Sequence, residues 1–233
     1  MRHVRPRLSS SRPIARSFAG PGLLSHVMVS KYLDRKPLYR QSQILGRENV
    51  DLSESTMGDW VGSVHHLLRP LIKTLQAYGF QADKLHTDDT PINVLAPGTG
   101  KTRQARLWVY TRDDRPSGDT AAPAVWFSYS PDRQSIHPQT HLKNYSGILQ
   151  ADAFAGYDKV YQSGRVLEVG CWVHARRKVY DIHVKHATPI TTHVLEQIAA
   201  LYKIEAEIRG SPPELRRTAR QTHAKPITAA LRT

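Results

Sequence analysis

The hydrophobic pattern changes period near residue 84, and this change restricts the possible folds more than any other feature of the chain. Before that point, apolar residues recur at helical spacing: Trp60, Val61, Val64, Leu67, Leu68, Leu71, Ile72 and Leu75. The preceding segment from Thr56 to Asp59 has the spacing of a capping box. After residue 84, short apolar runs are bounded by Gly and Pro, as in strands. We therefore predict a helical region followed by a sheet.

Five strands are predicted, at residues 85–95, 106–111, 124–129, 147–152 and 166–172. Helices are predicted at residues 139–145, 155–161 and 173–183. A long amphipathic helix follows, with Leu195, Ile198, Leu201, Tyr202 and Ile208 on one face. Three consecutive strands, then alternating helices and strands, describe a mixed α/β sheet flanked by helices. This order matches the ribonuclease H-like fold, although other α/β folds share it.

The region before the sheet is predicted to contain two short helices, at residues 23–33 and 38–47, ahead of the long one. Helix, short turn and helix beside a cationic segment resemble a helix-turn-helix. Bundled helices with short turns also occur without any role in DNA binding. Residues 1–20 are predicted to be a disordered basic arm, because Pro6 and Pro13 interrupt the amphipathic helix that a transit peptide requires.

Positive charge is concentrated at the two ends of the chain. The 233 residues include 33 Lys plus Arg and 20 Asp plus Glu, a net charge of +13. Residues 1–50 carry +8 and residues 165–233 carry +6, whereas the centre is close to neutral. Cationic flanks suit a polyanion such as DNA, but a basic, soluble surface without such a partner has the same composition. No apolar run is long enough to span a membrane, and Cys171 alone excludes a disulfide within the chain.

One segment imitates a phosphate-binding loop. Residues 95–102 read Leu-Ala-Pro-Gly-Thr-Gly-Lys-Thr, but Leu95 stands where that motif requires glycine. A strand pattern follows instead of the helix that would direct backbone amides to phosphate. We interpret this segment as a hairpin turn.

Aspartates fall at three positions of the predicted strands. Asp88 and Asp89 lie within the first strand and Asp152 lies at the end of the fourth. Aspartate is disfavoured inside strands, so it indicates either a hydrogen-bonded turn or a divalent metal, since Mg²⁺ and Mn²⁺ prefer carboxylate oxygens. If these two strands are neighbours, Asp88 and Asp152 converge on one cation.

Cys171 and His174 lie three residues apart, but a structural zinc site normally needs four ligands. A buried thiol and a hydrogen-bonded imidazole are the favoured interpretation. Arg176, Arg177 and Lys178 follow on a predicted helix and indicate either a phosphate-facing surface or a solvated one.

Many ordered segments of the chain resemble transposases of the bacterial insertion sequence 66 family. They include Pro37-Leu-Tyr-Arg-Gln41, Arg106-Leu-Trp-Val-Tyr110, Tyr129-Ser-Pro-Asp-Arg133, Leu149-Gln-Ala-Asp-Ala-Phe-Ala-Gly-Tyr157 and Cys171-Trp-Val-His-Ala-Arg-Arg-Lys178. The resemblance covers roughly residues 20–225. It implies a ribonuclease H-like core with an Asp-Asp-Glu triad, to which Asp88 and Asp152 contribute the two aspartates as catalytic residues and metal ligands.

The resemblance also implies cofactors, partners and a location. Mg²⁺ or Mn²⁺ would activate water or a DNA 3′-hydroxyl. The DNA would be transposon ends and target DNA, contacted by the basic residues Arg40, Lys101, Arg176, Arg177 and Lys178. A second copy or a full-length transposase is a further expected partner. The expected location is the bacterial cytoplasm, associated with the nucleoid.

Two departures from the family pattern are visible. Asp89 stands where the family usually has Glu. The third acid resembles a Glu in a downstream Asp-Asn-Asn segment, but the asparagines of this chain, Asn49, Asn93 and Asn144, all precede Asp152. We therefore expect a fragment truncated at both ends, with the helical region at residues 21–80, an incomplete catalytic core at residues 81–186, and the start of a helical insertion with a basic tail at residues 187–233.

Two functions follow from this expectation. The first is metal-dependent DNA cleavage and strand transfer at transposon ends. The second is a catalytically inactive DNA-binding remnant of such a transposase. A third possibility is a product that does not fold and has no role.

Overall fold

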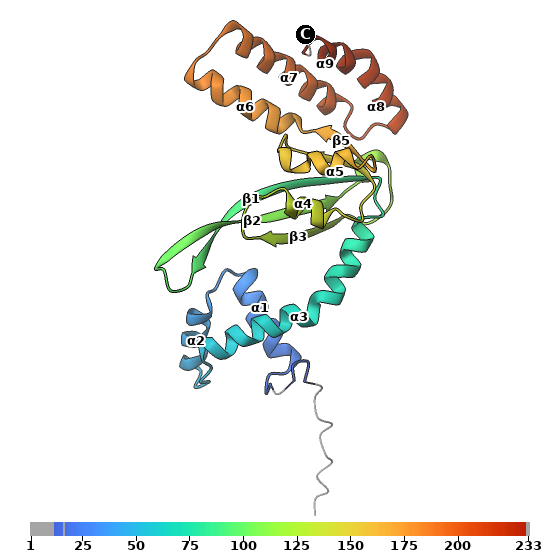
Figure 1. Ribbon diagram of the computed structural model, residues 1–233. Coiled ribbons are helices and arrows are strands. Elements are labelled where there is room, and N and C mark those ends of the chain that lie inside the picture. The colour runs from blue at the N-terminus through green and yellow to red at the C-terminus, as the bar shows by residue number, and fades with distance from the viewer. Residues whose placement is uncertain (1–11, 16, 232–233) are drawn as a thin grey trace, which may run out of the picture. The chain divides into compact units, whose positions relative to one another are not determined.

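The computed structural model describes residues 12–15 and 17–231 of the chain (Figure 1). Most of the basic arm predicted at residues 1–20 lies outside these described residues. The chain divides into two compact units, Met1–Thr74 and Leu75–Thr233, and each unit has its own hydrophobic core.

The first unit is helical. It contains α1 (Pro21–Tyr32), α2 (Leu38–Arg47) and most of α3 (Glu54–Gly79), which confirms the two short helices expected here. Their apolar faces meet in a small core, to which Ala19 also belongs. The largely exposed ring of Phe18 contacts Trp60 edge-on, with 5.2 Å between ring centres. The helix-turn-helix interpretation of this region stays a prediction.

The start of α3 differs from the sequence prediction. The helix begins at Glu54, before the expected capping box, so that prediction is wrong. The Ser53 hydroxyl accepts a hydrogen bond from the backbone N–H of Thr56 at 3.2 Å. Because this hydroxyl satisfies one of the free N–H groups of the first turn, the helix starts one turn earlier.

The second unit is built on a five-stranded mixed sheet (Figure 1). The strands are β1 (Lys84–Ala96), β2 (Lys101–Arg112), β3 (Ala124–Ser130), β4 (Gly147–Ala151) and β5 (Val166–Gly170). Their order in the sheet is β3-β2-β1-β4-β5. The first three pair antiparallel, whereas β4 is parallel to both β1 and β5. This arrangement confirms the predicted ribonuclease H-like sheet.

The hairpin of β1 and β2 extends beyond the other strands. Pairing between the two strands continues to Ala96 and Lys101, whereas β3 pairs with β2 only from Arg106 to Arg112. The second strand is therefore longer than the predicted residues 106–111. Residues 97–100 form the turn, with Gly98 and Gly100 at positive φ, so the segment that imitates a phosphate-binding loop is a hairpin turn as predicted.

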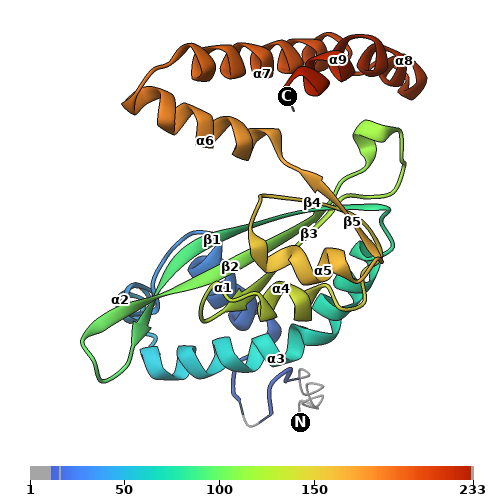
Figure 2. The same ribbon diagram turned by 45° about the horizontal axis from the view of Figure 1, so that its top comes forward.

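One face of the sheet carries the core of the second unit. Short helices α4 (Ile136–His141) and α5 (Asp158–Gln162) lie against it (Figures 1 and 2). The fully buried side chains there include Leu85, Trp108, Tyr110, Tyr145, Leu149 and Tyr157. The predicted helix at residues 139–145 starts earlier and ends at His141, because Tyr145 turns into the core and donates its hydroxyl to the Ile148 carbonyl at 2.8 Å.

Helices follow the sheet at its C-terminal side. They are α6 (Trp172–Lys185), α7 (Pro189–Glu207), α8 (Pro213–Ala219) and α9 (Lys225–Ala230), and α6 packs against α7 (Figure 2). Ile198 and Leu201 are buried, as predicted for the amphipathic helix, whereas Tyr202 of the predicted face is exposed. Within the described residues, none of the helices is long and apolar enough to cross a membrane.

Candidate active site

Asp88 and Asp152 come from neighbouring parallel strands. The pairing of β1 with β4 ends with His86 opposite Gln150, and Asp88 and Asp152 each lie two residues farther along. Extending the register therefore brings the two aspartates to the same level of the sheet. Asp152 itself follows β4, which ends at Ala151 rather than at residue 152 as predicted. Side chains alternate along a strand, so His86 and Asp88 lie on the face opposite the buried Leu85.

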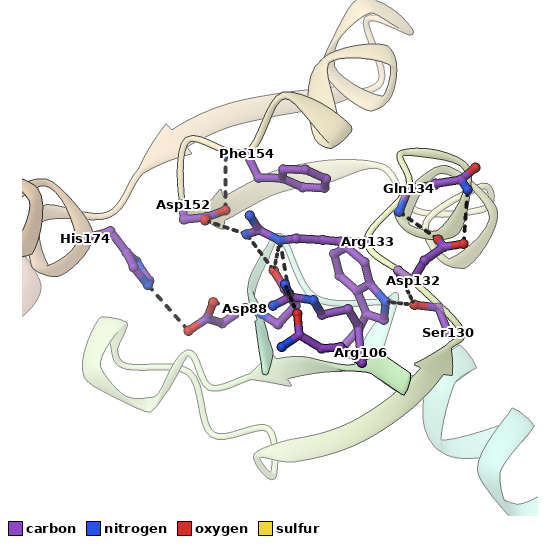
Figure 3. A network of polar contacts seen from close by, with 12 residues as sticks. Asp88, Arg106, Ser130, Asp132, Arg133, Gln134, Asp152, Phe154 and His174 are labelled. Carbon is purple, nitrogen blue, oxygen red and sulfur yellow. Dashed lines mark hydrogen bonds and ion pairs between the residues drawn. The ribbon is translucent and has the colours of Figure 1, made fainter. Parts of the chain in front are cut away.

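Asp88 is open to solvent on the face that α6 approaches. Its side chain is 49% exposed, and its Oδ2 atom lies 3.5 Å from Nε2 of His174 (Figure 3). Cys171 and His174 line a cavity of about 250 Å³ together with His86, Asp88 and Gln150. Cys171 is only half-buried, whereas a buried thiol was expected. The imidazole of His174 thus lies beside Asp88, and its buried Nδ1 atom has no hydrogen-bond partner among the residues that the structure describes.

Asp89 points to the other side of β1, because side chains alternate along a strand, and it is buried between two arginines. Its side chain is 1% exposed, and its Oδ2 atom accepts a hydrogen bond from Nη1 of Arg106 at 3.1 Å. Arg133 donates from Nε to both oxygens, at 2.9 and 3.1 Å. A buried carboxylate needs such partners to stay charged. Asp89 is therefore an anchor for two cationic side chains.

Arg133 connects this anchor to Asp152. Its Nη2 atom lies 3.1 Å from Oδ2 of Asp152 and 2.7 Å from Oδ1 of Asp89. The guanidinium also stacks over the ring of Phe154, with 4.1 Å to the ring centre. Burial opposes its charge, but the hydrogen bond to Asp89 and the charges of Asp89 and Asp152 raise the pKa of Arg133. Arg133 thus stays cationic beside both carboxylates.

The turn after β3 holds Arg133 in place. Trp108 donates its indole N–H to the Ser130 hydroxyl at 2.7 Å, and that hydroxyl donates to the Asp132 carbonyl at 2.5 Å. The Asp132 carboxylate in turn accepts from the backbone N–H of Gln134 at 2.9 Å. These bonds fix the backbone on both sides of Arg133 and link it to the sheet core through the buried Trp108.

The aspartates offer the donor atoms that a hard divalent cation prefers. Mg²⁺ is typically held by one or two carboxylates and keeps several waters. Asp88 and Asp152 therefore fit Mg²⁺ in the type of their donor atoms and in their common level in the sheet. Within residues 12–15 and 17–231, three or more His, Cys, Asp or Glu side chains do not gather as a metal-binding cluster. One oxygen of Asp152 is engaged by Arg133, which a bound cation would have to displace.

The predicted DNA-binding residues lie in three places. Arg176, Arg177 and Lys178 are exposed on α6, directly after His174, and Arg176 lies 5.5 Å from the ring centre of Tyr180. Lys101 is exposed at the start of β2, at the tip of the hairpin. Arg40 is exposed on α2 in the first unit. The α6 residues follow His174 on the same helix, whereas Lys101 lies on β2, the strand whose Val109 and Thr111 line the cavity beside Asp88.

Sequence reasoning missed the arginines of the site. In the sequence, Asp89 is a neighbour of the first acid and Arg133 belongs to a segment of resemblance, and neither pattern predicts their ion pair. The sequence feature that indicates these arginines is Asp89, a second acid in the same strand whose side chain points to the core side of the sheet. Such an acid requires a cationic partner, but the pattern does not indicate which arginine supplies it.

The fold and the acidic residues together define a class of protein with a ribonuclease H-like core. The order β3-β2-β1-β4-β5 places one aspartate on the central β1 and another directly after its parallel neighbour β4. The particular family follows from the sequence. The chain belongs to the Transposase IS66 family, whose pattern matches residues 16–233.

Similar proteins come from Sinorhizobium fredii. The uncharacterized protein y4qI is 36% identical over 216 residues, covering 90% of this chain and 40% of that protein. The uncharacterized protein y4hP is 36% identical over 228 residues, covering 91% of this chain and 41% of that protein. The chain therefore spans about two fifths of the length of these relatives.

Proposed function

We propose that this chain takes part in DNA transposition, as the part of a DDE-type transposase that carries two of the catalytic acids. Asp88 and Asp152 are the proposed metal ligands and catalytic residues, and Mg²⁺ or Mn²⁺ is the proposed cofactor. The observation that carries this proposal is the common level of the two aspartates on neighbouring parallel strands, in a chain of the IS66 family. A divalent cation held there supplies the activation of an attacking oxygen and the stabilisation of a leaving oxygen.

The residues around the aspartates have distinct proposed roles. His174 positions the Asp88 carboxylate, from which it lies 3.5 Å away. Arg133 positions Asp152 through their ion pair of 3.1 Å. Arg176, Arg177 and Lys178 are proposed to contact DNA phosphates near the site, since they follow His174 on the same helix. Phosphate contacts of this kind set the register of DNA without reading its sequence.

The remaining basic residues and the partner are also proposals. Lys101 on the hairpin and Arg40 on α2 are proposed to contact DNA farther from the acids. A second copy of the chain, or a full-length transposase, is the proposed partner that completes the catalytic assembly. The proposed location is the bacterial nucleoid, where such DNA lies.

The test is cleavage of DNA that carries transposon ends. The purified chain is incubated with this DNA and Mn²⁺, alone and with a full-length transposase of the family. We expect nicking that is lost in Asp88→Asn and in Asp152→Asn and retained in Asp158→Asn, which removes an exposed carboxylate of α5. Nicking that survives Asp152→Asn would overturn the assignment of that residue. DNA binding without nicking in either mixture would favour the inactive DNA-binding remnant.

A further inference from the structure

A second group of charged side chains lies away from the acidic site, at the turn between α7 and α8. A cavity of about 610 Å³ is lined there by Arg115, Glu205, Arg209, Arg216 and Arg220. Arg115 comes from a short 3₁₀ helix, η1 (Arg115–Ser117), between β2 and β3, and in Figure 2 this loop extends toward α8. Four arginines and one glutamate give this cavity an excess of positive charge.

Two of the four arginines are already paired. Arg220 donates to the two oxygens of Glu205, at 2.7 and 2.8 Å. Arg115 donates to the two oxygens of Asp113, at 2.8 Å each. Paired guanidiniums of this kind are fixed in orientation. They form the walls of the cavity and leave the other two arginines as the free positive charge.

Arg209 and Arg216 have no ion pair or side-chain hydrogen bond with any described residue. Within the described part of the chain, the buried Nε atom of Arg216 has no hydrogen-bond partner, although buried donors normally have one. The hydrogen bond from Arg220 and the charges of Arg220 and Arg216 lower the pKa of Glu205, so Glu205 is ionised and neutralises only part of this charge. An unpaired, partly buried guanidinium indicates a site for an anion with several acceptor oxygens.

The turn itself is suited to hold such a site. Gly210 adopts a positive φ of 79°, which favours glycine. Pro212 and Pro213 follow, and Pro213 begins α8. A Cβ atom added to Gly118 of the β2–β3 loop would lie 3.4 Å from Cγ of Pro213. The chain is therefore stiff on both sides of the cavity, which lowers the entropy that ordering the arginines on a ligand would require.

We propose that this cavity binds the backbone of duplex DNA, with Arg209 and Arg216 each donating to one phosphate. The planar fork of a guanidinium matches the oxygens of a phosphate. None of the described residues that line the cavity is aromatic, so the cavity offers no surface on which a free nucleotide could stack its base. The proposal rests on the proposed function only in its choice of DNA as the source of the phosphate.

The experiment measures DNA affinity as a function of salt. A fluorescent duplex of unrelated sequence is titrated with the full chain between about 50 and 200 mM salt. For the double variant Arg209→Gln, Arg216→Gln we expect the slope of log affinity against log salt to fall by about two, one for each lost phosphate contact. Arg217→Gln is the matched control, because Arg217 is exposed on the same helix and does not line the cavity. We expect its slope to equal that of the wild type.

Two results would overturn the proposal directly. One is an unchanged slope in the double variant, and the other is an equal loss in Arg217→Gln, which would indicate diffuse surface charge. Thermal melting without ligand is compared first, so that a variant that fails to fold is recognised. Single variants Arg209→Gln and Arg216→Gln, each expected to reduce the slope by about one, then provide the same comparison.

A second arm uses inorganic pyrophosphate as the probe. We expect pyrophosphate to raise the melting temperature of the wild type and of Arg217→Gln but not that of the double variant. Stabilisation by pyrophosphate with an unchanged DNA slope would mean that the cavity holds a free phosphate compound, which overturns the choice of DNA. Absence of any DNA binding by the wild type overturns this proposal and the DNA-binding part of the proposed function. If the wild type binds DNA but does not nick it, this result contradicts only the proposed catalysis and leaves the phosphate-binding proposal intact.

Discussion

Arg133 and Asp152 form an ion pair at 3.1 Å, between Nη2 of the guanidinium and Oδ2 of the carboxylate (Figure 3). The same guanidinium is held by the buried Asp89. The carboxylate that we propose as a metal ligand is therefore already paired with a positive charge. A divalent cation and Arg133 compete for this oxygen, and the charge of Arg133 opposes metal binding even where the two do not touch.

Replacing Arg133 is expected to tighten metal binding. In Arg133→Gln the positive charge next to Asp152 is lost. Removing the Coulomb repulsion between that charge and a bound cation in a partly buried site is expected to raise the affinity for Mn²⁺ by at least about tenfold. Titration of the protein with Mn²⁺, followed by calorimetry or by electron paramagnetic resonance of the free ion, measures this affinity. Arg133→Lys keeps the charge and is expected to bind Mn²⁺ as the wild type does.

Arg106→Gln is the control for that experiment. Arg106 pairs with Asp89 at 3.1 Å and makes no contact with Asp152. We expect this variant to lose stability without a comparable gain in Mn²⁺ affinity. Equal gains in Arg106→Gln and Arg133→Gln would show that the contact with Asp152 is irrelevant.

Removal of the buried Asp89 is expected to destabilise the second unit. Asp89→Asn leaves Arg106 and Arg133 without their common carboxylate, and breaking a buried ion pair in this way costs about 3 kcal/mol of unfolding free energy. This figure is the lower end of the usual range, because the two arginines are 20% and 36% exposed. Urea unfolding monitored by tryptophan fluorescence measures the loss. Asp113→Asn removes an exposed partner of Arg115 and should leave the unfolding midpoint unchanged.

Two glycines of α3 are expected to respond to alanine in opposite directions. A Cβ atom on Gly79 would overlap the ring of Trp126, which is 3% exposed, so Gly79→Ala should cost about 1–3 kcal/mol through overpacking. No heavy atom lies within 4 Å of a Cβ on Gly62, so Gly62→Ala should stabilise the helix by about 1 kcal/mol. Thermal unfolding of the two variants gives the signs, and equal signs would contradict the packing seen around Trp126.

The stability of the second unit should fall in mild acid because of His141. Burial, together with the charge of His137, lowers the pKa of His141 to about 4. Its Nδ1 atom and the Tyr110 hydroxyl form a hydrogen bond of 2.9 Å, and in the neutral tautomer that carries its proton on Nε2 the hydroxyl is the donor. The unfolded chain takes up the second imidazole proton near pH 6.5, so stability is present above that pH and is lost as the pH falls toward 4.

The size of this effect is bounded by one proton. The slope is at most about 1.4 kcal/mol per pH unit, and it is smaller here because the imidazole keeps some contact with solvent. Urea unfolding between pH 7 and pH 5 measures the slope. In His141→Gln the slope should be flatter, and an unchanged slope would assign the acid sensitivity to other groups.

The sheet could be predicted from the sequence because its strands are short apolar runs between Gly and Pro, and the order of elements then limited the fold. Strand ends were less accurate where pairing decides them. Residues 101–105 are mostly polar, so only their ladder with β1 makes them a strand. The start of α3 depended on the hydroxyl of Ser53, which competes with the equally plausible cap at Thr56.

The candidate site was predictable only in its acids. Asp88 and Asp152 are unusual residues for strands, and this made them visible. Arg133 lies 44 residues from Asp89 in the chain, and a turn after β3 carries no pattern that shows where its side chain points. The cavity at Arg209 and Arg216 likewise depends on how a turn and a distant loop meet.

The outer part of the β1–β2 hairpin is a ribbon of only two strands. Among the described residues, residues 92–96 and 101–105 pair with each other and with no third strand. Each strand of the ribbon therefore has one free edge, where backbone N–H and C=O groups can accept a further strand. An isolated two-stranded ribbon is only marginally stable in water. The hairpin thus has unpaired strand edges that are open to strand addition. The conformation of its outer part will depend on the strand that pairs with it.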